Sequence, residues 1–583
     1  MSENKTFAAI LPALRVMMRV DEVWLAALSA IVGVAGGLGV VVINTVTTSM
    51  HTALFALSGG LGLSESPLLD PRRVILVPAL GGLALGLSLW ALTRLRPNNL
   101  VDPIEANAMY GGRMSLKDSL IVAAQTAWSN GVGASVGMEA GYAQLGAGLA
   151  SWAGQKLRLR RNDLRVLVGC GAAAAIGGAF NAPLCGAFYG IELVIGVYSI
   201  GTLSFVVIAA LAGTLTVQIS GMASPPLIVD LPSSVPHDAY ALIIIEGVAC
   251  GLAGIAIMRG VTAIEAAFRR SGIPLWARPL LGGLVVGLLG CVTPKAMSSG
   301  HSALHAYINV SFPFLVVLGI LIAKSIASAF SIGAGFRGGL FFASLFLGAL
   351  FGKVFAGIVG IMPFVTPMPA GLYAVVGMSG LAAAIVGGPL TMTFLALEST
   401  ANFAVTMAVL AAAIAATITV RRLFGYSFAT WRFHLRGEQI RSAVDVGWIR
   451  ILTVGRMMRP VSLTVRTQSS LEAFRQDVPL GSTHRVVVTD EAGRYAGIAY
   501  PAEAASHPGE GVVESILHLQ GQFLLPGMNV KEALAAFEAA QADALAVLDG
   551  PDSRQILGLL TEQYALRRYN EELDRRRKDL SGE

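Results

Sequence analysis

The chain has 583 residues, of which 54% are hydrophobic and only 13% are charged. An average soluble domain carries about 25% charged residues, so the composition excludes an ordinary soluble protein over most of the length. The net charge of +6 is modest. The basic clusters of the chain are explained by the positive-inside bias of membrane loops. We therefore expect no nucleic-acid partner. No soluble-enzyme nucleophile or phosphate-binding loop stands out, and we expect no enzyme activity.

The first half of the chain contains long apolar runs. Residues 1–19 lack the compact apolar core and cleavage site of a signal peptide, so we expect a cytoplasmic N-terminal segment there. Several later runs approach the roughly 20 residues that cross a bilayer. Clear examples are VWLAALSAIVGVAGGLGVVVI (23–43), VILVPALGGLALGLSLWAL (74–92), LSFVVIAALAGTLTVQI (203–219) and AVTMAVLAAAIAATITV (404–420). The sequence therefore predicts a polytopic membrane protein with the lipid bilayer as a partner.

A glycine-rich stretch at 131–148, GVGASVGMEAGYAQLGAG, holds a single charge, Glu139. The glycines break the helix before Glu139, and a helical pattern resumes after it. Glu139 is therefore expected at a helix N-terminus inside the membrane, where free N–H groups and the helix dipole favour an anion. That anion can be the carboxylate or a diffusible ion that competes with it. The alternative is a structural charge, paired with an arginine or exposed in a loop.

The membrane part repeats itself. PLCGAFYGIE at 183–192 resembles PLTMTFLALE at 389–398, and LGA at 145–147 recurs at 347–349. The two matches lie at nearly the same offset, which chance rarely produces. Secondary transporters often contain such repeats, with sites at mid-membrane made by broken helices.

These repeats predict two homologous halves, at about 20–225 and 236–427, within a transmembrane domain of residues 20–430. Composition changes near residue 430, and we expect a linker at 431–450. Beyond it, short β-branched runs alternate with amphipathic helical patterns. That alternation predicts a soluble α/β domain over 451–583.

Four segments of the membrane part resemble the CLC family of chloride channels and chloride/proton antiporters. GMEAG (137–141) is similar to the G-x-E-G-P gate segment, and GGLFFA (338–343) to the G-x-F-x-P segment. The stretch 170–192, with its FNAPL, is the most specific match, and 377–402 resembles its counterpart in the second half. The resemblance implies an all-helical homodimer in which each subunit has two inverted halves, broken helices and its own pore.

The resemblance also implies roles for individual residues. Glu139 is similar to the gating glutamate, and Asn99 stands where the family has a serine. The remaining anion-binding positions are the amides of Met138, Glu139 and Ala140 at an outer site, the amides of Leu340 and Phe341 at a central site, and the Tyr426 hydroxyl that closes it. Backbone N–H groups attract an ion without trapping it, as a conduction pathway requires. The expected function is passage of chloride or another small anion through a pore gated by Glu139.

The sequence departs from the family pattern at several positions. The inner proton-relay glutamate falls at Leu193, which cannot carry a proton. The leucine therefore argues against strict coupling of anion transport to proton transport, and it favours a channel or a loosely coupled exchanger. The adjacent Glu192 is a possible proton path. Asn99 leaves the choice among chloride, nitrate and fluoride open, so fluoride-selective transport and chloride/proton antiport remain alternatives. The two prolines of the glycine-rich segments are replaced by Gly141 and Ala343, which lowers the expected rigidity of both turns.

Other charges in the membrane part have structural interpretations. Glu246 and Lys324 lie in apolar runs, where charge is usually paired, so we expect structural pairing or an aqueous vestibule for each. His301 and His305 have the i, i+4 spacing of a metal pair, but no third ligand is evident, so we expect no metal site. Glu398, the repeat mate of Glu192, is expected to be structural.

Residues 450–570 resemble a tandem pair of CBS regulatory domains. Such modules often bind adenine nucleotides through a G-x-x-[ST]-x-x-D ending, but GLLTEQY (558–564) has Thr561 and then Tyr564 in place of the Asp. We expect no cofactor, with an adenine nucleotide at the CBS pair as the alternative. Two other classes of function are a CBS-based membrane regulatory protein and a cation transporter. Clustered carboxylates within the spans would favour a cation transporter, whereas this chain has isolated ones. The expected location is a bacterial inner membrane with the tail in the cytoplasm.

Overall fold

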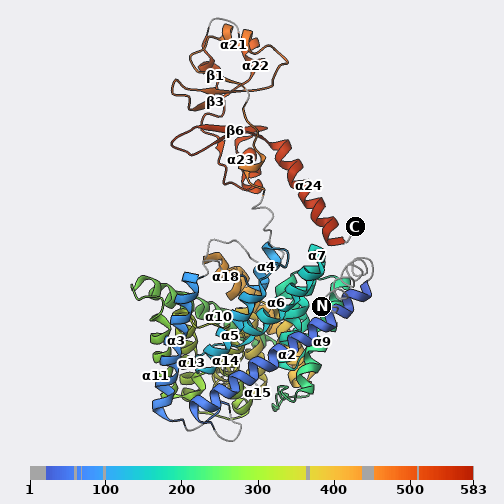
Figure 1. Ribbon diagram of the computed structural model, residues 1–583, viewed down its shortest axis with the longest axis vertical. Coiled ribbons are helices and arrows are strands. Elements are labelled where there is room, and N and C mark those ends of the chain that lie inside the picture. The colour runs from blue at the N-terminus through green and yellow to red at the C-terminus, as the bar shows by residue number, and fades with distance from the viewer. Residues whose placement is uncertain are drawn as a thin grey trace, which may run out of the picture. The chain divides into compact units, whose positions relative to one another are not determined.

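The computed structural model describes residues 22–57, 62–66, 69–95, 100–362, 368–435, 452–461, 463–507 and 511–581. The chain divides into two compact units, Met1–Asp445 and Val446–Glu583. The first is helical and the second mixes strands with helices (Figure 1).

The membrane unit consists of helices in its described part. The first half contains α2 (Glu22–Phe55), α3 (Pro71–Leu95), α4 (Pro103–Met109), α5 (Leu116–Gly131), α6 (Glu139–Leu157), α7 (Arg161–Phe180), α8 (Pro183–Tyr189), the π-helix η1 (Gly190–Ile195) and α9 (Ile200–Ile219). The second contains α10 (Ala239–Arg270), α11 (Arg278–Val292), η2 (Pro294–Ala296), α12 (His301–Tyr307), α13 (Phe314–Ala334), α14 (Phe341–Val359), α15 (Ala370–Val386), α16 (Pro389–Thr400), α17 (Phe403–Leu423) and α18 (Phe428–Leu435). Eight of the described helices are long and apolar enough to cross a membrane. The predicted all-α polytopic class is confirmed.

The two halves pack their central helices in the same way. Where α6 meets α7, a Cβ built on either Gly146 or Gly171 would overlap the carbonyl of the other. Where α14 meets α15, the same holds for Gly348 and Gly377. Small residues let helix backbones approach closely inside a membrane. Because these glycines occupy matching places in the two halves, the repeat detected in the sequence is also a repeat of helix packing.

The second unit contains two copies of one small motif. Its elements are α20 (Val454–Met457), β1 (Thr464–Arg466), α21 (Leu471–Asp477), β2 (Val486–Thr489), β3 (Tyr495–Ala499), α22 (Pro501–Ser506), η3 (Val513–Ile516), β4 (Phe523–Leu524), α23 (Val530–Ala540), β5 (Ala544–Leu548), β6 (Ile556–Thr561) and α24 (Glu562–Ser581). The sheets run β1-β2-β3 and β4-β5-β6. In each sheet the first pair is parallel and the second antiparallel. The predicted tandem α/β arrangement of the tail is confirmed.

A shared apolar core joins the two copies of the tail. Val487 and Tyr495 of the first sheet pack with Ala546 and Leu548 of the second. The Arg485 guanidinium also forms an ion pair of 2.7 Å with Asp543 across the copies. The two copies therefore form one compact unit.

Candidate anion-binding site

The two glycine-rich segments meet directly, although they come from different halves. The Gly137 amide donates to the Gly339 carbonyl at 2.9 Å, and the Gly339 amide donates back at 3.1 Å. α6 begins two residues after Gly137, and α14 begins two residues after Gly339. This short bridge therefore places the N-termini of the two helices side by side.

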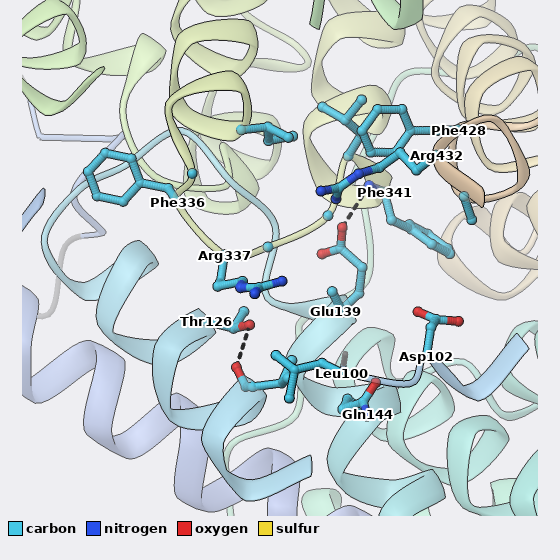
Figure 2. A pocket seen from close by; sticks show the side chains of 18 of the residues that line it. Leu100, Asp102, Thr126, Glu139, Gln144, Phe336, Arg337, Phe341, Phe428 and Arg432 are labelled. Carbon is cyan, nitrogen blue, oxygen red and sulfur yellow. Dashed lines mark hydrogen bonds between the residues drawn. The ribbon is translucent and has the colours of Figure 1, made fainter. Parts of the chain in front are cut away.

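The side chain of Glu139, the first residue of α6, lies at the N-terminus of α14. Its side chain is buried, with 4% of the residue exposed. Its Oε1 atom accepts hydrogen bonds from the Phe341 amide at 2.6 Å and the Phe342 amide at 3.3 Å (Figure 2). These N–H groups are among the four that a helix N-terminus leaves without an intrahelical partner, and they favour negative charge. The carboxylate is thus held by backbone amides rather than by an arginine.

Two glycines make room for this carboxylate. A Cβ built on Gly339 would lie 2.7 Å from Glu139 Oε1, and one built on Gly137 would overlap the carboxylate itself. Any larger residue at either position would expel Glu139 from the amides. The sequence pattern predicted that glycines interrupt the helices here. In the structure, Gly137 and Gly339 leave space for the Glu139 carboxylate to reach the N-terminus of α14.

A cavity of about 570 Å³ opens beside Glu139. Its ionisable lining side chains are Asp102, Tyr189, Glu265, Arg269, Arg278, Arg337 and Arg432, together with Glu139. Four arginines thus face three carboxylates. A cleft lined with an excess of one sign concentrates ions of the opposite sign, so this cavity attracts anions.

The cavity brings together part of the predicted anion-binding set. Ala140, Leu340 and Phe341 line it with Glu139. The amides that hold the carboxylate are those of Phe341 and Phe342, one residue further along than the expected pair. Met138 is the N-cap residue of α6 and is absent from the cavity wall that the structure describes.

Sequence reasoning missed Arg337, although a signal was present. Arg337 precedes α14 in the loop GFRGG and lines the cavity. A lone charge in a glycine-rich apolar stretch singled out Glu139, and the same signal marks Arg337. Asp102 and Gln144 also line the cavity, and neither carries such a mark in the sequence.

Glu192 and Glu398 cap helices in opposite halves. Glu192 accepts from the Thr391 amide at 3.0 Å and hydroxyl at 2.8 Å, and from the Leu390 amide at 3.4 Å, at the start of α16. Glu398 accepts from the amides of Leu184 and Cys185 at 2.8 and 2.9 Å, at the start of α8. The expectation that Glu398 is structural agrees with this geometry. Glu192 makes the equivalent structural contact.

Glu192→Ala is expected to destabilise the membrane unit by about 2 kcal/mol, because it leaves charge-assisted hydrogen bonds unmade at a helix start. The thermal unfolding temperature in detergent measures this. Thr391→Val is the matched control, since it removes only the hydroxyl bond and is expected to cost less. An unchanged unfolding temperature in Glu192→Ala would argue against the capping role.

Glu246 and Lys324 are both fully buried but differ in their partners. The Lys324 ammonium donates to the carbonyls of Ser298 at 2.6 Å and Ala296 at 3.4 Å, a structural contact as expected. Neither carboxylate oxygen of Glu246 has a hydrogen-bond partner among the described residues. Neither expected environment, a paired charge or an aqueous vestibule, is therefore found for Glu246, which is fully buried at the interface of α10 and α15 close to Gly377. His301 and His305 lie 4.7 Å apart between ring centroids.

Comparison with known proteins assigns the family. The profile of the voltage gated chloride channel family matches residues 81–421, which is more than half of the chain. The chain belongs to the CLC family. Members of this family are ion channels and transporters rather than enzymes, so this is an integral membrane protein of that class.

Bacterial CLC proteins are similar over most of the membrane unit. A protein of Ralstonia nicotianae described as ClcB-like is 31% identical over 406 residues, covering 67% of this chain and 92% of its own. The voltage-gated ClC-type chloride channel ClcB of Salmonella typhimurium is 31% identical over 360 residues, covering 61% and 86%.

Solved CLC structures share the fold. A slow cyanobacterial Cl⁻/H⁺ antiporter superposes with a TM-score of 0.62 at 22% identity, covering 71% of this chain and 97% of that one. A CLC-type fluoride/proton antiporter gives a TM-score of 0.56 at 20% identity, covering 68% and 95%. A eukaryotic CLC transporter gives 0.60 at 18% identity and covers 94% of this chain and 98% of its own. The CLC fold with two inverted repeats is thereby confirmed.

Two residues of the CLC pattern lie away from the expected place or outside the described part. Tyr426 stacks on His434 with ring centroids 4.6 Å apart, and it packs against Trp431 at 5.5 Å. It is absent from the described cavity wall, where Phe428 and Arg432 of the next helix lie instead. Asn99 lies outside the described residues, and its neighbours Leu100 and Asp102 line the cavity.

In the CLC tail, Tyr564 takes the place of the Asp in the nucleotide-binding pattern. The guanidinium carbons of Arg459 and Arg567 lie 4.8 and 5.2 Å from its ring centroid. The Thr561 hydroxyl accepts from the Tyr564 amide at 3.4 Å. The position that would hold a ribose through a carboxylate is thus an aromatic ring close to two cations.

Proposed function

We propose that this CLC protein passes chloride or another small anion across the membrane and that Glu139 is its gate. The observation that carries the proposal is the carboxylate of Glu139 on the amides of Phe341 and Phe342. A helix N-terminus is a general anion site, and Glu139 fills it as a tethered anion. A diffusible anion can bind those amides only when the carboxylate leaves, so the position of Glu139 controls passage.

We further propose conduction that is channel-like or loosely coupled to protons. Leu193 lines the cavity where the family resemblance implies an inner acid, and leucine cannot relay a proton. Glu192 is committed to the start of α16, which argues against a proton path through it. Chloride/proton antiport and fluoride transport are the alternatives, because similar structures include an antiporter of each kind.

The remaining parts of the proposal concern location and assembly. The bacterial relatives support a bacterial membrane location, and we propose the inner membrane with the tail in the cytoplasm. The family resemblance supports a homodimer. The absence of a carboxylate at Tyr564 supports a tail that works without a bound nucleotide, through contacts between its two copies of the CBS motif.

Anion efflux from proteoliposomes loaded in turn with chloride and fluoride tests the proposal, with external pH recorded throughout. We expect chloride efflux without stoichiometric proton uptake. Matched proton uptake would show an antiporter, and fluoride efflux far above that of chloride would show a fluoride transporter. Absence of any anion flux would overturn the proposed function.

A further inference from the structure

Only one oxygen of the Glu139 carboxylate is bonded. Oε1 takes both amide hydrogen bonds, whereas Oε2 is buried and has no hydrogen-bond partner among the described residues. A carboxylate displaced from the amides by an anion would lose its bonds altogether. Burying an unpaired charge is costly, so the group must then either take a proton or meet a cation.

Arg337 is placed to be that cation. Its loop is fixed by the Arg337 amide, which donates to Ser129 Oγ at 3.0 Å. Four residues later the chain reaches Phe341, whose amide holds Glu139. The Arg337 side chain lines the same cavity as Glu139 and extends toward it (Figure 2). A guanidinium binds a carboxylate through two parallel hydrogen bonds and stays charged at any physiological pH.

Most of the other ionisable groups on the cavity wall are less suited to this role. Asp102 and Glu265 carry the wrong charge, and Tyr189 is neutral. Arg269 is exposed, and Arg278 Nε is committed to the Ile273 carbonyl at 2.9 Å. Arg432 of α18 also lines the cavity, and its guanidinium carbon lies 5.9 Å from the Phe428 ring centroid.

We propose that Arg337 is the second docking partner of Glu139: the carboxylate moves from the amides of Phe341 and Phe342 to the Arg337 guanidinium when an anion enters, and so opens the path without taking a proton. This inference rests on the proposed gating role of Glu139. The inference is consistent with a leucine at position 193, where the family has a proton-carrying glutamate. A gate that alternates between amides and a guanidinium requires no proton relay.

The test measures chloride efflux of Arg337→Gln at neutral and acid pH, in the wild-type and in the Glu139→Gln background. Arg269→Gln is the matched control, since it removes one positive charge from the same cavity wall. We expect Arg337→Gln to lower efflux at neutral pH about tenfold, or about 1.4 kcal/mol, which is close to the lower end of what a hydrogen bond to a charged group contributes. Acid restores that efflux by protonating Glu139. Arg269→Gln lowers efflux less, and equally at both pH values.

The Glu139→Gln background separates the two ways in which Arg337 can act. If Arg337 docks the carboxylate, Arg337→Gln has no larger effect there than Arg269→Gln. If the tenfold loss persists there, or if acid restores nothing, Arg337 merely attracts anions and the inference is overturned. Arg337→Lys keeps the charge and is expected to retain most neutral-pH efflux, which covers the case that the glutamine variant fails to fold. Wild-type protein without anion flux would overturn the proposed function itself.

Discussion

Glu139→Gln is expected to raise chloride efflux at neutral pH by about tenfold and to make it independent of pH. A hydrogen bond to a charged group is worth about 1.5–3 kcal/mol, and Glu139 Oε1 accepts two such bonds. The neutral amide of glutamine competes less well for the N–H groups of Phe341 and Phe342. An incoming chloride therefore displaces it more often, and no titratable group remains at the gate.

Efflux from proteoliposomes at several external pH values measures this effect. Glu246→Gln is the matched control, because Glu246 is also a buried glutamate in the membrane unit but lies outside the described cavity wall. Its efflux should equal that of the wild type. Equal efflux and equal pH dependence in Glu139→Gln and wild type would show that Glu139 does not control passage.

Gly377→Val is expected to lower the thermal unfolding temperature in detergent more than any other single change described here. A Cβ at this position would lie 2.5 Å from the Gly348 carbonyl oxygen and 2.9 Å from Gly352 Cα. These are backbone atoms of α14, so the two helices must separate to relieve the overlap. Overpacking a tight contact costs about 1–3 kcal/mol and occasionally more. Gly171→Val is expected to behave in the same way in the first half.

Gly319→Ala provides the control for the glycine prediction. Gly319 lies in α13, and a Cβ there would meet nothing within 4 Å. Alanine is a better helix former than glycine by about 1 kcal/mol, so the unfolding temperature should stay level or rise. A similar fall in Gly319→Ala and Gly377→Val would mean that the loss reflects helix propensity or handling rather than the crossing of α14 and α15.

The architecture could be predicted from the sequence because the two halves share short local motifs. The Pro-Leu–Glu spacing and the recurring LGA mark equivalent helices, and the structure places equivalent glycines at equivalent crossings. Glu139 could be found because a charge in an apolar, glycine-rich stretch has few structural explanations. The exact amides could not, because the shift from Leu340 to Phe342 depends on where α14 begins, and helix boundaries are uncertain by one or two residues.

Contacts between distant segments were beyond the sequence pattern. Tyr426 could be placed near α18, but its packing on Trp431 and His434 depends on the turn between α17 and α18. The burial of Glu246 without a partner depends on how α10 meets α15. Likewise, the repeated Pro-Leu–Glu spacing does not show that each glutamate caps a helix of the other half.

That exchange of caps has a consequence for how the protein is made. α8 emerges from the ribosome about two hundred residues before Glu398, so its first amides have no carboxylate until the second half is synthesised and inserted. Conversely, the start of α16 is capped by Glu192, which is inserted earlier with the first half. A fragment containing either half alone leaves a helix start uncapped, and two fragments produced together can restore both caps to each other.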